Sequence, residues 1–457
     1  MDRIELYLDI VPIPILLAGV AGAILCFLAI PAQYRLVLAL SIVPVWLTIG
    51  RLPDLGILSP AAKLSSSLVL FLVAVGAFLH PGPRRRMPGL VWLYVIMAVV
   101  SFLYVFQVSD RMVALLLRTQ WLMMVLAAIA LVRTVVTFQD LLRIINGLAF
   151  GCFLALLLPL SGLILFPGEA FLRGAGRFQP YGVNSNQIGM LFALSIPLLY
   201  YKAITTRAVS LKPIILGAVG LTIGMALLTA SRQTALAILM VGIPIIFKLS
   251  RRPVITIVAL AVGFGAVTYV VGLAENTAFD RFTQLESERM VIWQQYINQV
   301  YTSRPLFGLL GVNSELAFRS SVVGAHPHSA YFNLMYMGGL SLFVPMMILL
   351  VTSLSCALRA WRMRNQMGVD PLLISLLGAL LLAMYTQGIF NQVVYWPTYT
   401  WSFVHVVLAI FFITIGSELK AGEEPQHVLP DLEYEDWEYD DAFDDGEYDE
   451  DLAVAGY

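Results

Sequence analysis

Long runs of hydrophobic residues, separated by short polar stretches, fill the chain from its start to about residue 416. Most of these runs are about 17–25 residues long, which is the length that a helix needs to cross the hydrocarbon core of a bilayer. Because a segment in hydrocarbon has to satisfy its own backbone hydrogen bonds, the runs are predicted to be helices. The pattern therefore predicts an all-α, polytopic transmembrane helical bundle.

The composition agrees with this interpretation, since 59% of the residues are hydrophobic and only 12% are charged. That is about half the charge of an ordinary soluble domain, so a soluble protein is excluded and no nucleic-acid partner is expected. About 12 or 13 spans are predicted within a transmembrane domain of residues 1–422. The candidate spans are residues 10–30, 34–50, 64–80, 88–107, 112–132, 144–166, 186–201, 213–229, 233–248, 253–273, 329–354, 371–390 and 400–416.

The basic residues of the short loops give the bundle a direction. Loops rich in Lys and Arg stay on the cytoplasmic side of a membrane, and Arg84-Arg85-Arg86 is the strongest such mark. Alternation from there puts the C-terminus inside and the N-terminus outside. The loops at 167–185 and 230–232, and the long extracytoplasmic loop at about 274–328, are then predicted to lie outside.

The C-terminal segment 423–457 differs from the rest of the chain. It holds 15 carboxylates between Glu423 and Asp451, with interspersed aromatic residues and no Lys or Arg. It has no helical or strand periodicity, so it is predicted to be a disordered cytoplasmic tail. Both a cytosolic partner for this acidic tail and a solvated extension without a dedicated role remain open.

The long outer loop contains a predicted short helix from Glu288 to Tyr301. Trp293, Ile297 and Tyr301 share one face of it, and Arg304-Pro305 follows its end. An amphipathic helix of this kind lies on the membrane surface with its apolar face down, or packs against the bundle. The pattern leaves both placements open.

Arginine and asparagine side chains gather in the predicted outer loops. Arginine outside runs against the usual charge bias, and its planar fork suits phosphate. Several arginines at one site would hold a diphosphate and stabilise it as a leaving group; solvated or headgroup-facing charges are the alternative. The candidates in these loops are Arg177, Asn184, Asn186, Arg232, Arg289 and Arg304.

Arg118 stands inside the fifth span, about two turns from its outer end. A charge at that depth is costly, so Arg118 is expected to face the bundle interior and line a groove for a lipid diphosphate. Snorkelling to the outer interface is the alternative.

Two of the five histidines, His326 and His328, lie one residue apart at the end of the long loop. Histidine is the side chain best matched to proton transfer near neutral pH. Since alternating positions on an extended stretch point opposite ways and no Asp or Cys lies nearby, a metal site is not predicted. No cofactor is expected. A catalytic or substrate-contacting histidine and simple packing at a helix start are both considered.

Three stretches of the chain, in order and spacing, resemble the O-antigen ligase and O-antigen polymerase superfamily of bacterial envelope glycosyltransferases. They cover residues 170–345, and one position departs from the family pattern, because Ser329 follows His328 where the family normally has Asn. The matching pieces are Arg177-Phe178 with Asn184-Ser185-Asn186-Gln187, then Thr229-Ala230-Ser231-Arg232, and finally Arg289-Met290-Val291-Ile292-Trp293, Arg304-Pro305-Leu306-Phe307-Gly308, His328-Ser329-Ala330-Tyr331 and Met337-Gly338-Gly339.

The resemblance implies a metal-independent, inverting glycosyltransferase of the bacterial inner membrane, with its active site facing the periplasm. It would move a saccharide from a polyprenyl-diphosphate carrier, held among membrane lipids, onto an acceptor glycan or lipid core. His328 would orient or deprotonate the acceptor, and Arg232 and Arg289 would bind the diphosphate.

Two other classes of protein compete with this interpretation. A transporter or flippase of lipid-linked oligosaccharide usually shows internal repeats and broken helices at the midplane, and the sequence shows no repeat. A membrane scaffold that presents the acidic tail leaves the outer arginines unexplained. Within the enzyme class, the ligase and polymerase types stay unresolved.

Overall fold

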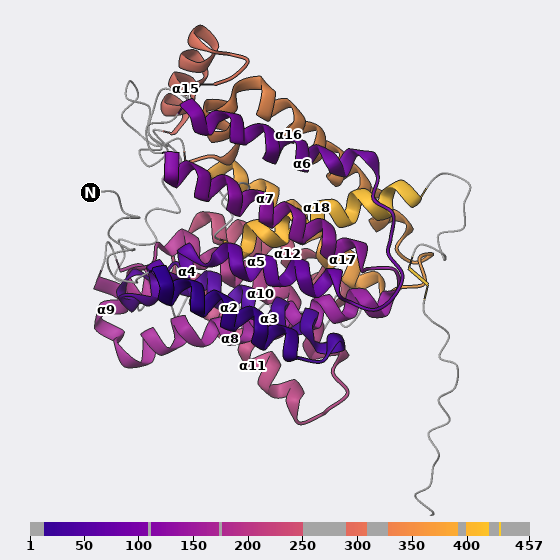
Figure 1. The fold of residues 1–457 in the computed structure, drawn as a ribbon. Helices are drawn as coiled ribbons and strands as arrows, with labels where there is room; N and C mark the ends of the chain where they lie inside the picture. The colour runs from indigo at the N-terminus through magenta and orange to yellow at the C-terminus, as the bar shows by residue number, and fades with distance from the viewer. Residues whose placement is uncertain are drawn as a thin grey trace, which may run out of the picture.

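The computed structural model describes residues 13–107, 111–172, 176–249, 289–308, 328–391, 399–419 and 429–430. Within these ranges every regular element is a helix, which confirms the all-α fold class (Figure 1). The long helices are α2 (Ile13–Ala29), α3 (Ala32–Ile49), α5 (Ser66–Phe78), α6 (Trp92–Ser101), α7 (Arg111–Arg133), α8 (Phe138–Leu165), α10 (Ser185–Thr205), α11 (Leu211–Leu228), α12 (Arg232–Leu249), α15 (Arg289–Ser303), α16 (Ala330–Met363), α17 (Pro371–Phe390) and α18 (Thr400–Glu418). Short helices α4 (Leu58–Leu64) and α9 (Pro167–Leu172), and 3-10 turns η1 (Pro53–Leu55), η2 (Gly89–Val91), η3 (Phe102–Gln107) and η4 (Pro180–Gly182), join them.

Nine helices in the described part of the chain are long and apolar enough to cross a membrane. A tenth is obtained if α4 and α5, which meet at a bend of 49°, count as one span. The chain is therefore a multi-pass membrane protein by the length and composition of its helices. The predicted span at 253–273 lies outside the described residues.

Two helices extend well beyond the apolar runs that predicted them. α8 begins at Phe138 because Thr137 and Asp140 form a capping box, in which each side chain bonds the other's backbone N–H. α16 continues to Met363 through basic, water-compatible residues. Both extensions lie at the Arg85 end of the bundle, which we define by Arg85, Arg133 and Arg359.

The Arg85 end brings together the loops that were predicted to lie inside. Arg85 forms an ion pair with Glu418 at 2.8 Å, and its backbone N–H donates to the carbonyl of Arg133 at 2.8 Å. Arg359 donates to the carbonyl of Gly416 at 3.0 Å. Loops that are far apart in the sequence thus lie at one end of the same bundle.

Two residues of the predicted disordered tail also belong to this end. Leu429 is fully buried in the hydrophobic core, and the backbone N–H of Phe138 donates to the carbonyl of Pro430 at 3.5 Å. Leu429 and Pro430 thus contact the helical bundle, and the disorder of the segment 423–457 stays a prediction. The rest of the tail lies outside the described residues.

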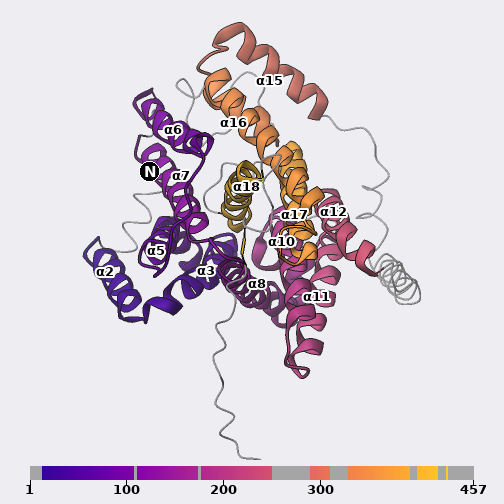
Figure 2. The same ribbon diagram turned by 90° about the vertical axis from the view of Figure 1, so that its right-hand side faces the viewer.

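α18 forms the centre of the bundle, since 94% of the residues in its apolar stretch are buried. Viewed along the bundle, α18 is nearly end-on and surrounded by other helices (Figure 2). α10 and α17 are also mostly buried. In α11, by contrast, only 22% of the residues are buried inside the bundle, so α11 lies at the periphery. A helix buried on all sides has to be apolar all round, and α18 is apolar over nearly its whole length.

The helix predicted in the long outer loop is confirmed as α15. Its aromatic residues pack on α16: Trp293 stacks on Phe332 with ring centroids 5.0 Å apart, and Tyr296 meets Tyr336 at 5.1 Å. Of the two placements left open, the structure thus shows packing against the bundle. α15 lies side-on in the view where α18 is end-on, so it runs across the bundle (Figure 2).

The turn after α15 docks on a kink in α16. Gly339 has φ 57° and ψ −151°, which breaks the helix and frees backbone N–H groups. Leu340 N donates to Pro305 O at 2.8 Å and Ser341 N donates to Leu306 O at 3.0 Å. A Cβ on Gly339 would lie 2.6 Å from the nitrogen of Gly308, so both glycines are needed for this close backbone contact.

We expect Gly339→Ala to destabilise the protein by several kcal/mol more than Gly368→Ala. Gly368 is the matched control because it also has a positive φ, of 67°, but nothing lies near its missing Cβ. Gly368→Ala therefore carries only the backbone strain, about 1 kcal/mol. Thermal unfolding of the purified protein in detergent measures both, and equal midpoints would contradict the docking of the turn.

Candidate functional site

The opposite end of the bundle, which we call the Arg177 end, contains residues 176–184 and 229–232 of the loops predicted to lie outside. Its organising contact is the guanidinium of Arg177. Nε donates to the carbonyl of Thr229 at 2.9 Å, and Nη2 donates to Oδ1 of Asn186 at 3.0 Å. The backbone N–H of Phe178 adds a bond to the carbonyl of Leu228 at 2.9 Å. Arg177 thus ties the end of α11 to the start of α10.

The two asparagines predicted as ligands, Asn184 and Asn186, lie at the start of α10. Asn184 is its N-cap, and its Oδ1 accepts from the backbone N–H of Asn186 at 2.9 Å. Such a cap satisfies one of the N–H groups that a helix start leaves without a partner. Asn186 in turn accepts the bond from Arg177. Both asparagines therefore hold the site's scaffold together.

A tight turn carries the chain from α11 into α12 and positions Arg232. Ala230 has a positive φ of 46°, and Ser231 Oγ accepts from the backbone N–H of Thr234 at 3.3 Å. Arg232 is the first residue of α12 and is exposed. Its guanidinium accordingly stands at a positive helix end, facing outward.

The C-terminal end of α17 connects α12 to the rest of the site. Gln233 Nε2 donates to the carbonyl of Phe390 at 2.8 Å, and Gln387 Nε2 donates to the carbonyl of Gln233 at 3.1 Å. Asn391 Nδ2 contacts Met190 Sδ of α10 at 3.9 Å. α10, α12 and α17 therefore meet pairwise at this end.

The start of α16 joins the same end of α17. His328 is exposed and has a positive φ of 48°, and Ser329 behind it is fully buried. Ser329 Oγ donates to the carbonyl of Gly388 at 3.5 Å, and Tyr331 Oη donates to the carbonyl of Tyr385 at 2.8 Å. These bonds fix the backbone that carries His328, and they connect it through α17 to Arg232.

Arg289 is the first residue of α15. Trp293, one turn later, meets Phe332, and Tyr296 meets Tyr336, so α15 and the start of α16 run in the same direction. His328 lies four residues before Phe332, as Arg289 lies four before Trp293. The register therefore puts Arg289 and His328 at the same end of this helix pair.

Arg304 lies apart from that end. It follows the last residue of the 15-residue helix α15, about 22 Å from the helix start at 1.5 Å per residue. Its side chain is exposed, and its carbonyl accepts from the backbone N–H of Gly308 at 2.9 Å. The structure thus places Arg304 at the docked turn and not beside Arg289.

Arg118 is 7% exposed, which confirms that it faces the bundle interior. One turn before it, Ala114 packs against Met337 of α16. Two residues after Arg118, Gln120 Nε2 donates to the carbonyl of Lys63 at 3.0 Å. Arg118 consequently lies on the inner side of α7, beneath the Arg177 end.

His326 lies outside the described residues. Among the described residues, no group of three or more His, Cys, Asp or Glu side chains gathers in a way that could hold a metal ion.

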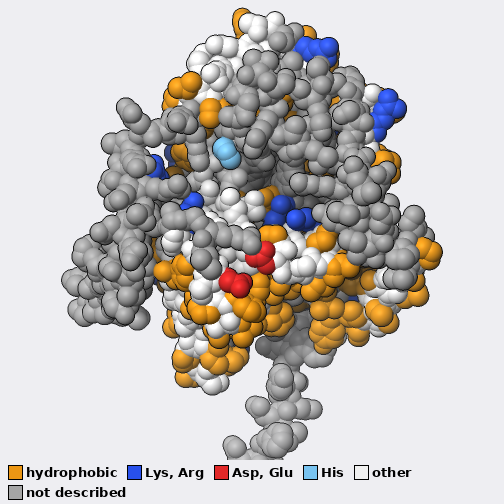
Figure 3. Space-filling model, turned by 90° about the vertical axis from the view of Figure 1, so that its left-hand side faces the viewer, with side chains coloured by type: hydrophobic (Ala, Val, Ile, Leu, Met, Phe, Trp, Pro, Cys, Tyr) orange, Lys and Arg blue, Asp and Glu red, His pale blue; other side chains and the backbone are white. Residues whose placement is uncertain are grey.

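Positive charge is concentrated at this end by both side chains and backbone. α10, α12 and α16 all begin here, and each helix start carries partial positive charge and free N–H groups. Figure 3 shows Lys and Arg side chains near the centre and towards the edges of this face, with acidic side chains and a histidine between them. An anionic group is the ligand that such an arrangement attracts.

A second arginine, Arg51, makes a structural contact at the Arg177 end. The guanidinium of Arg51 lies 3.5 Å from the ring centroid of Tyr399. Burial lowers the pKa of Arg51, and Tyr399 partly offsets this shift. Burial raises the pKa of Tyr399, with Arg51 opposing, so the phenol stays neutral and serves as a cation–π partner. This contact ties the loop after α3 to the start of α18.

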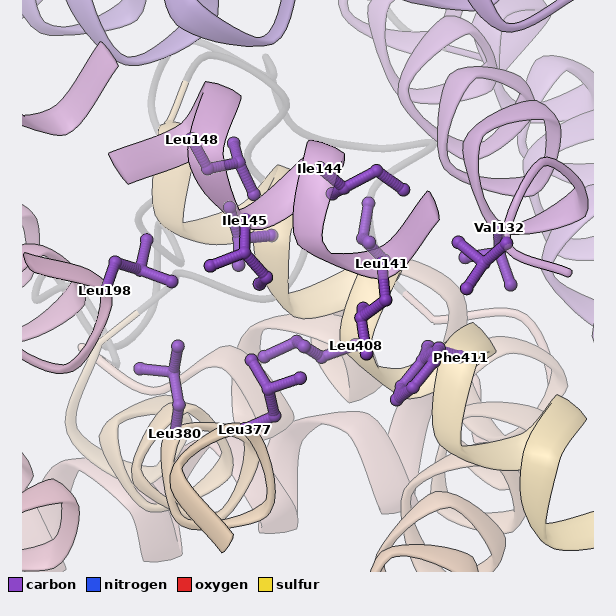
Figure 4. Close-up of a pocket in the computed structure, with 13 residues that line it drawn as sticks. Val132, Leu141, Ile144, Ile145, Leu148, Leu198, Leu377, Leu380, Leu408 and Phe411 are labelled. Atoms are coloured by element: carbon purple, nitrogen blue, oxygen red, sulfur yellow. The ribbon is translucent and has the colours of Figure 1, made fainter. Parts of the chain in front are cut away.

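A small cavity of about 20 Å³ lies towards the other end of the bundle. Its lining is wholly apolar and comes from α7, α8, α10, α17 and α18, including Val132, Ile144, Leu198, Leu377 and Leu408 (Figure 4). A space with no polar partner suits neither a water molecule nor a charged ligand. It is a packing gap and takes no part in the site.

The residues of α17 that join the site were not predicted from the sequence. Gln387 is 1% exposed within an apolar helix. A buried polar residue inside a membrane span is itself a functional signal, and this signal, used for Arg118, also marks Gln387. Gln233 gave no separate signal because it stands beside Arg232 at a helix start.

The chain matches no family model, no curated protein and no solved structure. The similarity of its motifs to the O-antigen ligase and polymerase superfamily therefore stays a hypothesis.

We predict that Arg177→Ala lowers the stability of the protein by about 1–3 kcal/mol, because two hydrogen bonds from a charged group are lost and two acceptors are left without it. Arg207→Ala is the control, since Arg207 is an exposed arginine in a predicted inner loop. Thermal unfolding in detergent compares the two. Equal unfolding midpoints for Arg177→Ala and Arg207→Ala would contradict a stabilising role for the hydrogen bonds of Arg177.

Proposed function

We propose that this protein is a membrane glycosyltransferase. It transfers a saccharide from a polyprenyl-diphosphate carrier to an acceptor glycan at the extracytoplasmic face of the bacterial inner membrane. The observation that carries the proposal is the convergence of Arg232 and His328 on the end of α17, with Arg289 beside the start of α16. These residues are 39–96 positions apart in the sequence.

Each group has a role that fits its position. Arg232 and Arg289 each open a helix, so side-chain charge and helix dipole act together on the diphosphate. Arg177 and Asn186 hold the start of α10 against the end of α11, which leads directly into α12, and act as positioning residues. His328 is exposed on a backbone held by Ser329, where an acceptor hydroxyl reaches it.

The proposed reaction is a single displacement with inversion. His328 takes the proton of the acceptor hydroxyl, whose oxygen forms a bond to the anomeric carbon. The bond from that carbon to the diphosphate oxygen breaks, and its electron pair leaves with the diphosphate. Arg232 and Arg289 stabilise the charge that develops on this leaving group. The acceptor is a growing glycan in the polymerase type and a lipid core in the ligase type.

We predict that His328→Ala lowers the rate of sugar transfer by about 10²-fold or more, as expected when a general base is removed. Arg232→Ala and Arg289→Ala are expected to lower it about as much, because each removes charge stabilisation from the leaving group. Purified variants in proteoliposomes, supplied with a lipid-linked saccharide and an acceptor, give the rate as new glycosidic bond per unit time.

Arg207→Ala serves as the control for the loss of one positive charge elsewhere. Wild-type rates in His328→Ala and Arg289→Ala would overturn the assignment of the site. Movement of the lipid-linked sugar across the bilayer, with no new glycosidic bond, would show that the protein is a flippase and not an enzyme.

A further inference from the structure

Four buried polar atoms at the Arg177 end have no hydrogen-bond partner among the described residues. They are Ser185 Oγ, Gln233 Oε1, Thr234 Oγ1 and Gln387 Oε1. The four side chains are 0%, 8%, 0% and 1% exposed. A buried polar atom without a partner costs about 1–3 kcal/mol, so four at one place require an explanation other than chance packing.

The four atoms belong to one junction of three helices. Thr234 of α12 lies against Gly189 of α10, which has no side chain to hold it off, and Ser185 stands one turn before Gly189. Gln233 of α12 bonds to the end of α17, and Gln387 of α17 bonds back to Gln233. The junction is directly beside Arg232.

The orientation of the two glutamine amides is set by their partners. Each Nε2 donates to a backbone carbonyl, of Phe390 for Gln233 and of Gln233 for Gln387. A carbonyl only accepts, so each amide nitrogen has to face it and each Oε1 has to face away. The junction therefore offers two fixed acceptors, together with two hydroxyls that both donate and accept.

We propose that this junction, residues Ser185, Gln233, Thr234 and Gln387, is the subsite that binds the hydroxyl groups of the sugar next to the diphosphate. The inference rests on the proposed function and adds to it the recognition of the saccharide. The ligand must bring O–H or N–H donors to the two amide oxygens, which the hydroxyls and acetamido groups of a hexose supply. On this proposal the bound sugar gives each buried atom a partner, which requires the close contact between Thr234 and Gly189 to open.

The same chemistry argues against other ligands here. The oxygens of an ionised diphosphate only accept hydrogen bonds and are repelled by amide oxygens, so the diphosphate belongs with Arg232. A metal cation would suit carbonyl oxygens, but the guanidiniums of Arg177 and Arg232 and the starts of α10 and α12 make the surroundings positive. A neutral, hydroxyl-rich group fits both constraints.

The variants Ser185→Ala and Thr234→Val test the subsite, because each removes a hydroxyl that bonds nothing among the described residues. Both are expected to unfold at the wild-type temperature or above it. Ser195→Ala is the matched control, since Ser195 is a buried serine of α10 whose hydroxyl already bonds the carbonyl of Leu191 at 2.7 Å.

Two probes separate sugar from diphosphate: geranylgeranyl diphosphate, and the same lipid diphosphate carrying one N-acetylhexosamine. Wild-type protein in detergent is expected to bind the sugar-bearing probe more tightly. Each variant is expected to lower the affinity for the sugar-bearing probe about three- to tenfold, the effect of one hydrogen bond. The affinity for geranylgeranyl diphosphate is expected to stay unchanged.

The outcomes distinguish the subsite from the function on which it rests. Equal affinity of wild type for both probes, or sugar binding unaffected in both variants, would overturn the subsite and leave the diphosphate site intact. Binding of neither probe by wild type would overturn the proposed function. If Ser195→Ala also lowers the affinity for both probes, the effect comes from a general loss of packing, and this result too would count against the subsite.

Discussion

Polar groups inside a membrane have to find their partners within the protein, and this constraint shapes the Arg177 end. Arg177 donates to Thr229 and Asn186, and Gln233 and Gln387 donate to backbone carbonyls. Each bond joins two helices that are distant in the sequence. The bonds thereby fix the starts of α10, α12 and α16 at one face, and the exposed Arg232 and His328 are positioned as a consequence.

The two ends of the bundle satisfy their charges in different ways. At the Arg85 end, Arg85 pairs with Glu418, and burial lowers the pKa of Arg85 while Glu418 raises it. This is a closed, neutral arrangement that holds helices together. At the Arg177 end, Arg177 donates to the carbonyl of Thr229 and to Oδ1 of Asn186. Helices α10, α12 and α16 also begin there, and the partial positive charge of helix starts attracts anions, which is the property that a diphosphate site requires.

Much of the fold could be predicted from the sequence, because apolar runs and their lengths determine helices in a membrane. The run at 371–390 coincides with α17, and the helix predicted from Glu288 is α15. The position of α15 could not be predicted, since an apolar face suits lipid and protein equally. Asn184 resembled a ligand because cap and ligand use the same oxygen. Gln387 was missed because its bonds depend on which helices become neighbours.

The central claim is that Arg232 and His328 face the same side of the membrane, opposite the basic loops. Single cysteines at positions 232, 328, 207 and 362, in a background without Cys26, Cys152 and Cys356, test it by labelling with an impermeant maleimide. In intact cells, we predict labelling at 232 and 328, and labelling at 207 and 362 only after the membrane that holds the protein is opened. Labelling of 232 and 328 from opposite sides would contradict the account.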